Sequence, residues 1–86
     1  MNINELIEIV KSKIEAEIVM QGFKIEDKSF LHKNHKGNQE GMFHLKLIIK
    51  SEELKKLSKI ESTKKIYNIL EHELKEHIHS IQILLS

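Results

Sequence analysis

Histidine side chains are this chain's most reactive groups. The sequence has six histidines and no cysteine, so its own side chains can hold a metal only through imidazole or carboxylate groups. His32 and His35 are separated by two residues, and His77 and His79 by one. These four imidazoles could hold zinc, although a structural zinc site built from histidine alone is unusual. The competing interpretation is a half-buried structural role for His79 and simple solvent exposure for the loop pair.

Catalysis is not expected from the remaining side chains. The chain has no Ser-His-Asp set, no glycine-rich phosphate loop and no pair of acids with catalytic spacing. We therefore expect no enzymatic activity and no small-molecule substrate.

Lysines supply a second candidate surface. All fourteen basic residues are lysine, and thirteen acidic residues bring the net charge to +1. Without arginine, the chain lacks bidentate recognition of guanine or phosphate. Five lysines cluster in the second half of the chain and would attract phosphate non-specifically: Lys55, Lys56, Lys59, Lys64 and Lys65. The same pattern is also typical of a solvated face in a lysine-rich chain.

Apolar spacing predicts a helix at the start of the chain. Apolar residues recur every three or four positions over residues 3–18, which indicates one helical face. Asn4 is the predicted N-cap and Gly22 the predicted end.

Two strands are predicted to follow, over residues 23–26 and 43–50, because apolar and polar residues alternate there. Between them, residues 28–41 are polar and contain two glycines, which predicts a loop that carries His32 and His35. Loops of this length in compact domains tend to be functional or mobile. His44 falls on the polar side of its strand, so we expect it on exposed sheet surface.

The second half predicts two helices and a last strand. Ser51 starts a short helix through Leu57, and Ser58 or Ser62 caps a longer one. The apolar residues of the longer helix are Ile66, Tyr67, Leu70, Leu74 and Ile78, with Tyr67 expected in the core. His72 and His77 are expected to face solvent, and residues 78–86 to form a strand. Strand parity places His79 with Ile81 and Ile83, which predicts its partial burial.

These elements predict an α+β fold in the order α-β-β-α-α-β, with a three-stranded sheet and helices on one face. Eighty-six residues are enough for a single domain, over residues 1–86. No apolar run approaches the length of a membrane span, and no secretory signal is evident. We therefore expect a cytoplasmic protein with no membrane partner.

The sequence resembles the BolA-like family from about Phe23 to Ile83. The family's loop motif D-x-S-x-x-H-x-x-H-x-G stands here as Asp27, Ser29, His32, His35 and Gly37. The other matches are Phe43 and Leu45 for F-x-V, Ile66 and Tyr67 for (V/I)-Y, and residues 78–81 for V-H-A-L. The family's R-H-R segment is replaced by Ser62, Thr63 and Lys64.

The resemblance implies a class II KH-like fold and a role in iron–sulfur metabolism. Family members pair with a monothiol glutaredoxin and share a [2Fe-2S] cluster with its cysteine and a glutathione thiol. By that resemblance, His79 is the main ligand and His32 or His35 the second, with no cofactor in the isolated chain. The shared cluster implies a function in cluster trafficking or iron sensing.

The alternative function is that of a DNA-binding transcriptional regulator, because some BolA-like proteins are described as such. The five clustered lysines would then line a helix-turn-helix-like face. RNA binding of the KH type is disfavoured, since no G-x-x-G loop exists among Gly22, Gly37 and Gly41.

Overall fold

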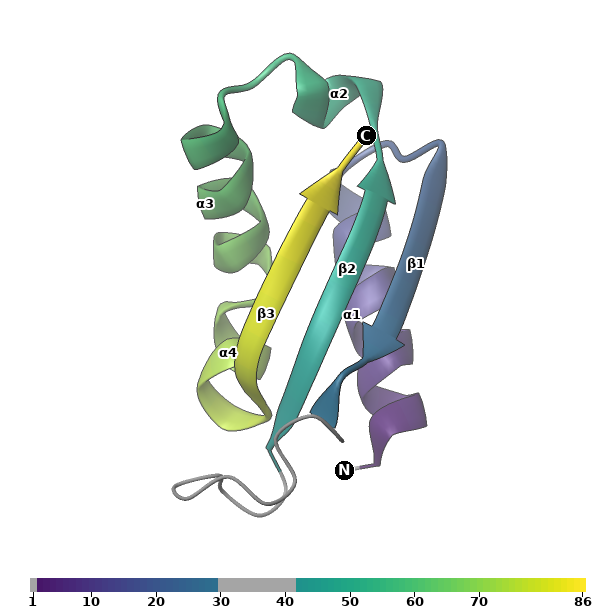
Figure 1. The fold of residues 1–86 in the computed structure, drawn as a ribbon, viewed down its shortest axis with the longest axis vertical. Coiled ribbons are helices and arrows are strands. Elements are labelled where there is room, and N and C mark those ends of the chain that lie inside the picture. The colour runs from purple at the N-terminus through teal and green to yellow at the C-terminus, as the bar shows by residue number, and fades with distance from the viewer. Residues whose placement is uncertain (1, 30–41) are drawn as a thin grey trace.

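The computed structural model describes residues 2–29 and 42–86. Its elements are α1 (Ile3–Glu17), β1 (Gly22–Asp27), β2 (Phe43–Lys50), α2 (Glu52–Lys55), α3 (Lys59–Ile69), α4 (Glu71–Glu76) and β3 (Ile78–Leu85). The sheet order is β1-β2-β3, with β1 antiparallel and β3 parallel to the central β2. Figure 1 shows the helices together on one face of this sheet. The predicted α+β architecture is confirmed.

Helix α1 begins and ends earlier than the sequence predicts. Asn2, and not Asn4, is the N-cap, because its Oδ1 accepts a hydrogen bond from the Glu5 backbone N–H at 2.9 Å. The helix ends at Glu17, and Gly22 is the first residue of β1. The predicted apolar face is confirmed, since its residues at steps of four are buried: Leu6, Val10, Ile14 and Ile18.

The hydrophobic core lies between the sheet and the helices. From β2 it receives the alternating residues Leu45, Leu47 and Ile49. The helices on that face and the start of β3 complete it with Leu54, Ile66, Leu70 and Ile78. Period-two alternation on β2 therefore separates a helix-covered apolar face from an open polar face.

The predicted long helix is two helices, α3 and α4. Ser58 caps α3 as predicted, accepting from the Glu61 N–H at 3.1 Å, whereas Ser62 is buried within the helix. The helices meet at Leu70, whose backbone leaves helical geometry with φ −100° and ψ 16°. No glycine or proline lies at this junction to reveal it in the sequence. Ile78 is the first residue of β3 and not the last of the helix.

One ion pair joins α1 to α4 at the edge of the core. The Lys13 Nζ lies 2.6 Å from Oε2 of Glu73, whose side chain is 4% exposed. Among the residues that the structure describes, Oε1 of Glu73 has no hydrogen-bond partner. The buried Glu73 carboxylate thus has one ion-pair partner among the described residues, the Lys13 amine.

The open face of the sheet is basic around one acid. Glu26 of β1 lies 3.6 Å from the amines of Lys24 and Lys28 and 4.0 Å from that of Lys46. Partial burial raises the pKa of Glu26, but the charges of Lys28, Lys24 and Lys46 outweigh it and hold the pKa below its ordinary value of 4.5.

Acid should therefore remove a contribution that Glu26 makes to stability. A carboxyl whose pKa is lower in the folded state stabilises the fold above its unfolded pKa, and that stability is lost as the pH falls through the folded pKa. We expect Glu26→Gln to flatten the fall of the urea midpoint between about pH 7 and pH 3. Glu8→Gln, an exposed glutamate of α1, is the matched control. Equal curves for Glu26→Gln and the wild type would contradict the assignment.

No helix within residues 2–29 and 42–86 is long and apolar enough to cross a membrane.

Candidate functional site

A β-bulge on β3 sets the position of His79. Phe43 of β2 pairs with Ile78, but the next residue, His44, pairs with Ser80. His79 therefore has no directly opposite residue on β2, and the alternation of side chains is interrupted. His79 and Ser80 are both exposed as a result. The prediction that His79 is partly buried on the same side as Ile81 is wrong, because the bulge interrupts the alternation of side chains between the two faces.

His44 lies beside His79 and is buried. Only 5% of it is exposed, so the prediction of an exposed sheet residue is wrong. Its ring Nδ1 is hydrogen-bonded to the Ser80 Oγ at 2.7 Å, and its ring centroid is 4.9 Å from that of His79. His79 and Ser80 at the bulge thus contact the His44 imidazole, which lies on the open face of the sheet. Figure 1 shows the helices on the other face.

The two residues that follow β1 contact the backbone of His44. The Lys28 N–H donates to the His44 carbonyl at 2.7 Å, and the His44 N–H donates to the Ser29 Oγ at 3.1 Å. Ser29 is itself turned by a hydrogen bond from its N–H to Asp27 Oδ1 at 2.9 Å. His32 and His35 belong to residues 30–41, which lie outside the described residues.

The predicted lysine cluster lies on α2, α3 and the turn between them. Lys55, Lys56, Lys59 and Lys64 are exposed, as a solvent-facing basic surface requires. Lys65 is partly buried and pairs with Glu53 at 3.2 Å. Helix α2 has only four residues, so the pair α2–α3 has a very short first helix for a helix-turn-helix.

Comparison with known proteins identifies the family. The profile of the BolA-like protein family matches residues 14–86, which contain β1, β2, α2, α3, α4 and β3. The chain belongs to the BolA-like family. This range also contains His32, His35, His79 and the five clustered lysines.

The relatives of this BolA-like protein support the assignment. It is 31% identical over 78 residues to a protein of Haemophilus influenzae named DNA-binding transcriptional regulator BolA, covering 91% of this chain and 73% of the other. The BolA domain of SufE1 from Arabidopsis thaliana superimposes with a TM-score of 0.78 at 26% identity, covering 100% of this chain and 93% of that one. BolA1 from Arabidopsis thaliana shares the fold, with a TM-score of 0.77 at 23% identity over 92% and 87% of the two chains.

As a metal centre, the described part of this BolA-like protein is incomplete. Within residues 2–29 and 42–86, no three histidines or acids lie close enough to hold a metal ion. His79 is an exposed imidazole, and its role as a metal ligand stays a prediction. His77, at the C-cap of α4, packs against the exposed His72 with ring centroids 6.1 Å apart. The four-histidine zinc site stays a prediction, since His32 and His35 are outside the described residues.

The outer face of α3 carries two apolar residues that the sequence did not assign there. Ile60 is 68% exposed and Tyr67 is 42% exposed, so the prediction of a core role for Tyr67 is wrong. Ile60, Lys64 and Tyr67 are spaced by four and three residues, which places them on one side of the helix. The buried residues Ser62 and Ile66 define the opposite side. This helical spacing is the sequence signal from which the exposure of Ile60 and Tyr67 could be predicted.

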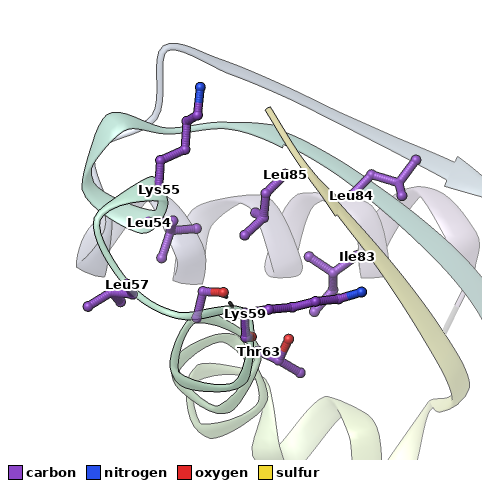
Figure 2. Close-up of a pocket in the computed structure, with 9 residues that line it drawn as sticks. Leu54, Lys55, Leu57, Lys59, Thr63, Ile83, Leu84 and Leu85 are labelled. Carbon is purple, nitrogen blue, oxygen red and sulfur yellow. Dashed lines mark hydrogen bonds between the residues drawn. The ribbon is translucent and has the colours of Figure 1, made fainter.

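A hollow of about 370 Å³ separates the lysine cluster from the end of β3. Its apolar lining comes from α2, the turn after it and β3, and comprises Leu54, Leu57, Ile83, Leu84 and Leu85. Figure 2 shows Lys59 extended across it towards Ile83, while Lys55 points away. The lysine cluster is therefore bordered by an apolar hollow on the side that faces β3.

Proposed function

We propose that this protein is a non-enzymatic, cytoplasmic adaptor that shares a [2Fe-2S] cluster with a monothiol glutaredoxin and takes part in cluster trafficking or iron sensing. The observation that carries the proposal is the bulge on β3, which exposes the His79 imidazole next to His44, whose backbone is hydrogen-bonded to Ser29. When bound, such a cluster supplies iron, sulfide and a redox couple whose potential depends on its ligands.

The ligand inventory of the chain favours a shared cluster over one that it binds alone. Clusters of this type take four ligands, usually thiolates, with imidazole as a known replacement. This chain has no thiolate, so cysteine and glutathione ligands must come from the partner and its cofactor. His79 would be joined by His32 or His35.

The decisive experiment is a titration of this protein into a cluster-loaded monothiol glutaredoxin. The glutaredoxin is reconstituted anaerobically with iron, sulfide and glutathione, and visible circular dichroism is recorded at each addition. A new spectrum that saturates at a one-to-one ratio supports the shared cluster. An unchanged glutaredoxin spectrum, with no complex on size-exclusion chromatography, contradicts it.

DNA binding is the second candidate function. The Haemophilus influenzae relative is named a DNA-binding transcriptional regulator, and four of the five clustered lysines here are exposed. Because three glutamates accompany the cluster and arginine is absent, we expect phosphate contacts without strong base recognition. The three glutamates are Glu52, Glu53 and Glu61.

Neutralising the exposed lysines should weaken DNA binding equally on unrelated sequences. In the combined variant of Lys55→Gln, Lys59→Gln and Lys64→Gln, each lost phosphate contact should reduce the slope of log affinity against log salt by about 0.9. Fluorescence anisotropy on two unrelated duplexes at several salt concentrations measures this. Lys75→Gln on α4 is the control. Wild-type affinity and slope in the combined variant would remove these lysines from any DNA interface.

A further inference from the structure

The exposed imidazole of His79 rests on a second imidazole. The ring centroids of His79 and His44 lie 4.9 Å apart, and their planes are inclined by 44°. His44 extends from the open face of the sheet, where a polar ring would ordinarily be hydrated, yet it is almost fully buried. His79 therefore has a covered aromatic surface on one side and solvent on the other.

His44 is held by three hydrogen bonds, from β3 on one side and from the residues that follow β1 on the other. Its ring is hydrogen-bonded to Ser80 of β3 at 2.7 Å. Its backbone N–H donates to the Ser29 hydroxyl at 3.1 Å, and its carbonyl accepts from the Lys28 N–H at 2.7 Å. Because β2 is the central strand, His44 is tied to β3 on one side and to the end of β1 on the other. Its ring is thus a fixed surface.

A histidine that binds a metal from a bulge needs a neighbouring surface that fixes the orientation of its ring. A lone exposed histidine samples several χ1 rotamers, and a metal accepts its nitrogen from only one direction. Contacts behind a ligating histidine normally select that direction. We propose that His44 is a positioning residue that holds the His79 imidazole in its metal-binding orientation, with Ser80 as the anchor of His44. The metal-binding part of this inference rests on the proposed function.

Two substitutions at position 44 separate the ring contact from other effects. His44→Leu removes the ring and its hydrogen bond to Ser80, whereas His44→Phe keeps a planar ring in the same place. In the free protein, three-bond NMR couplings report the χ1 distribution of His79. We expect one dominant rotamer in the wild type and in His44→Phe, and averaged couplings in His44→Leu. This readout needs neither glutaredoxin nor cluster.

The same variants can then be titrated into the cluster-loaded glutaredoxin. His44→Leu should raise the concentration at half-saturation by about tenfold, as loss of an orienting contact does at other metal sites. His44→Phe should stay near the wild-type value. If the wild type forms no shared cluster, the proposed function fails, while the couplings still decide the role of His44.

Wild-type His79 couplings in His44→Leu overturn the positioning role. Averaged His79 couplings in His44→Phe also overturn it. If His44→Leu does not fold, His44→Asn decides the question, because it removes the ring but keeps a polar side chain at this position. Averaged His79 couplings in His44→Asn support the role, and unchanged couplings overturn it.

Discussion

Replacing His79 by alanine should abolish the shared cluster and leave the fold intact. The side chain is exposed and sits at a bulge, so its loss removes no core contact. Exposed substitutions of this kind change the free energy of unfolding by about 0.5 kcal/mol or less. A cluster that lacks one ligand of four should not form with this chain. Visible circular dichroism of cluster-loaded glutaredoxin should therefore stay unchanged on addition of His79→Ala.

The matched control is His72→Ala. His72 is also exposed, but it lies on α4 and its ring contact is with His77. This variant should give the wild-type spectrum. Urea unfolding of both variants measures the fold directly. An unfolded His79→Ala variant would make His79 a structural residue, and a wild-type spectrum for it would place the ligand elsewhere.

Removing the amine of Lys13 should destabilise the protein strongly. Lys13→Met keeps the length of the side chain but leaves the buried Glu73 carboxylate without its partner. Isolating one member of a fully buried pair costs about 3 kcal/mol or more. Because the Lys13 side chain is 41% exposed and solvent screens its charge, we expect a cost of about 2 kcal/mol here. This is a large share of the 5–15 kcal/mol that stabilises a typical domain. The urea midpoint should fall accordingly, with an unchanged slope.

Lys11→Met is the control for Lys13→Met. Lys11 also lies on α1 and faces a glutamate, but its distance to Glu15 is 3.9 Å and both side chains are more than half exposed. Its loss should cost less than about 0.5 kcal/mol. The double variant of Lys13→Met with Glu73→Met should recover most of the lost stability, because two apolar side chains replace the pair. Equal costs for Lys11→Met and Lys13→Met would show that Glu73 is hydrated in solution.

The sequence predicts the fold well because the strongest patterns coincide with the core. Alternation in residues 43–50 and four-residue steps in α1 both reflect burial of one face, which is the dominant energy in folding. Local capping is predicted equally well at Ser51 and Ser58, whose hydroxyls accept from backbone N–H groups three residues on. The prediction of Asn4 as the N-cap is wrong because Asn2 offers the same side-chain oxygen two residues earlier.

The site is less predictable, because it depends on a departure from periodicity. The bulge adds one unpaired residue, His79, between the pairs Phe43–Ile78 and His44–Ser80. The sequence of residues 78–81 contains no signal that predicts it. The prediction for His44 is wrong for a related reason, because its ring contacts Ser80 and His79, which are distant in sequence and lie at the bulge. His79 itself could be selected as a ligand only through the family resemblance, and its ligand role stays a prediction.

The parallel pairing of β2 with β3 orders the events of biosynthesis. A growing chain emerges from the ribosome N-terminus first, so β1, β2 and the segment with His32 and His35 are made well before His79. Strand β3 can dock on β2 only after α2, α3 and α4 have crossed the sheet. Until then, His44 lacks both Ser80 and the ring above it. A nascent or truncated chain without β3 thus lacks His79 and leaves the ring of His44 without its two partners on that strand.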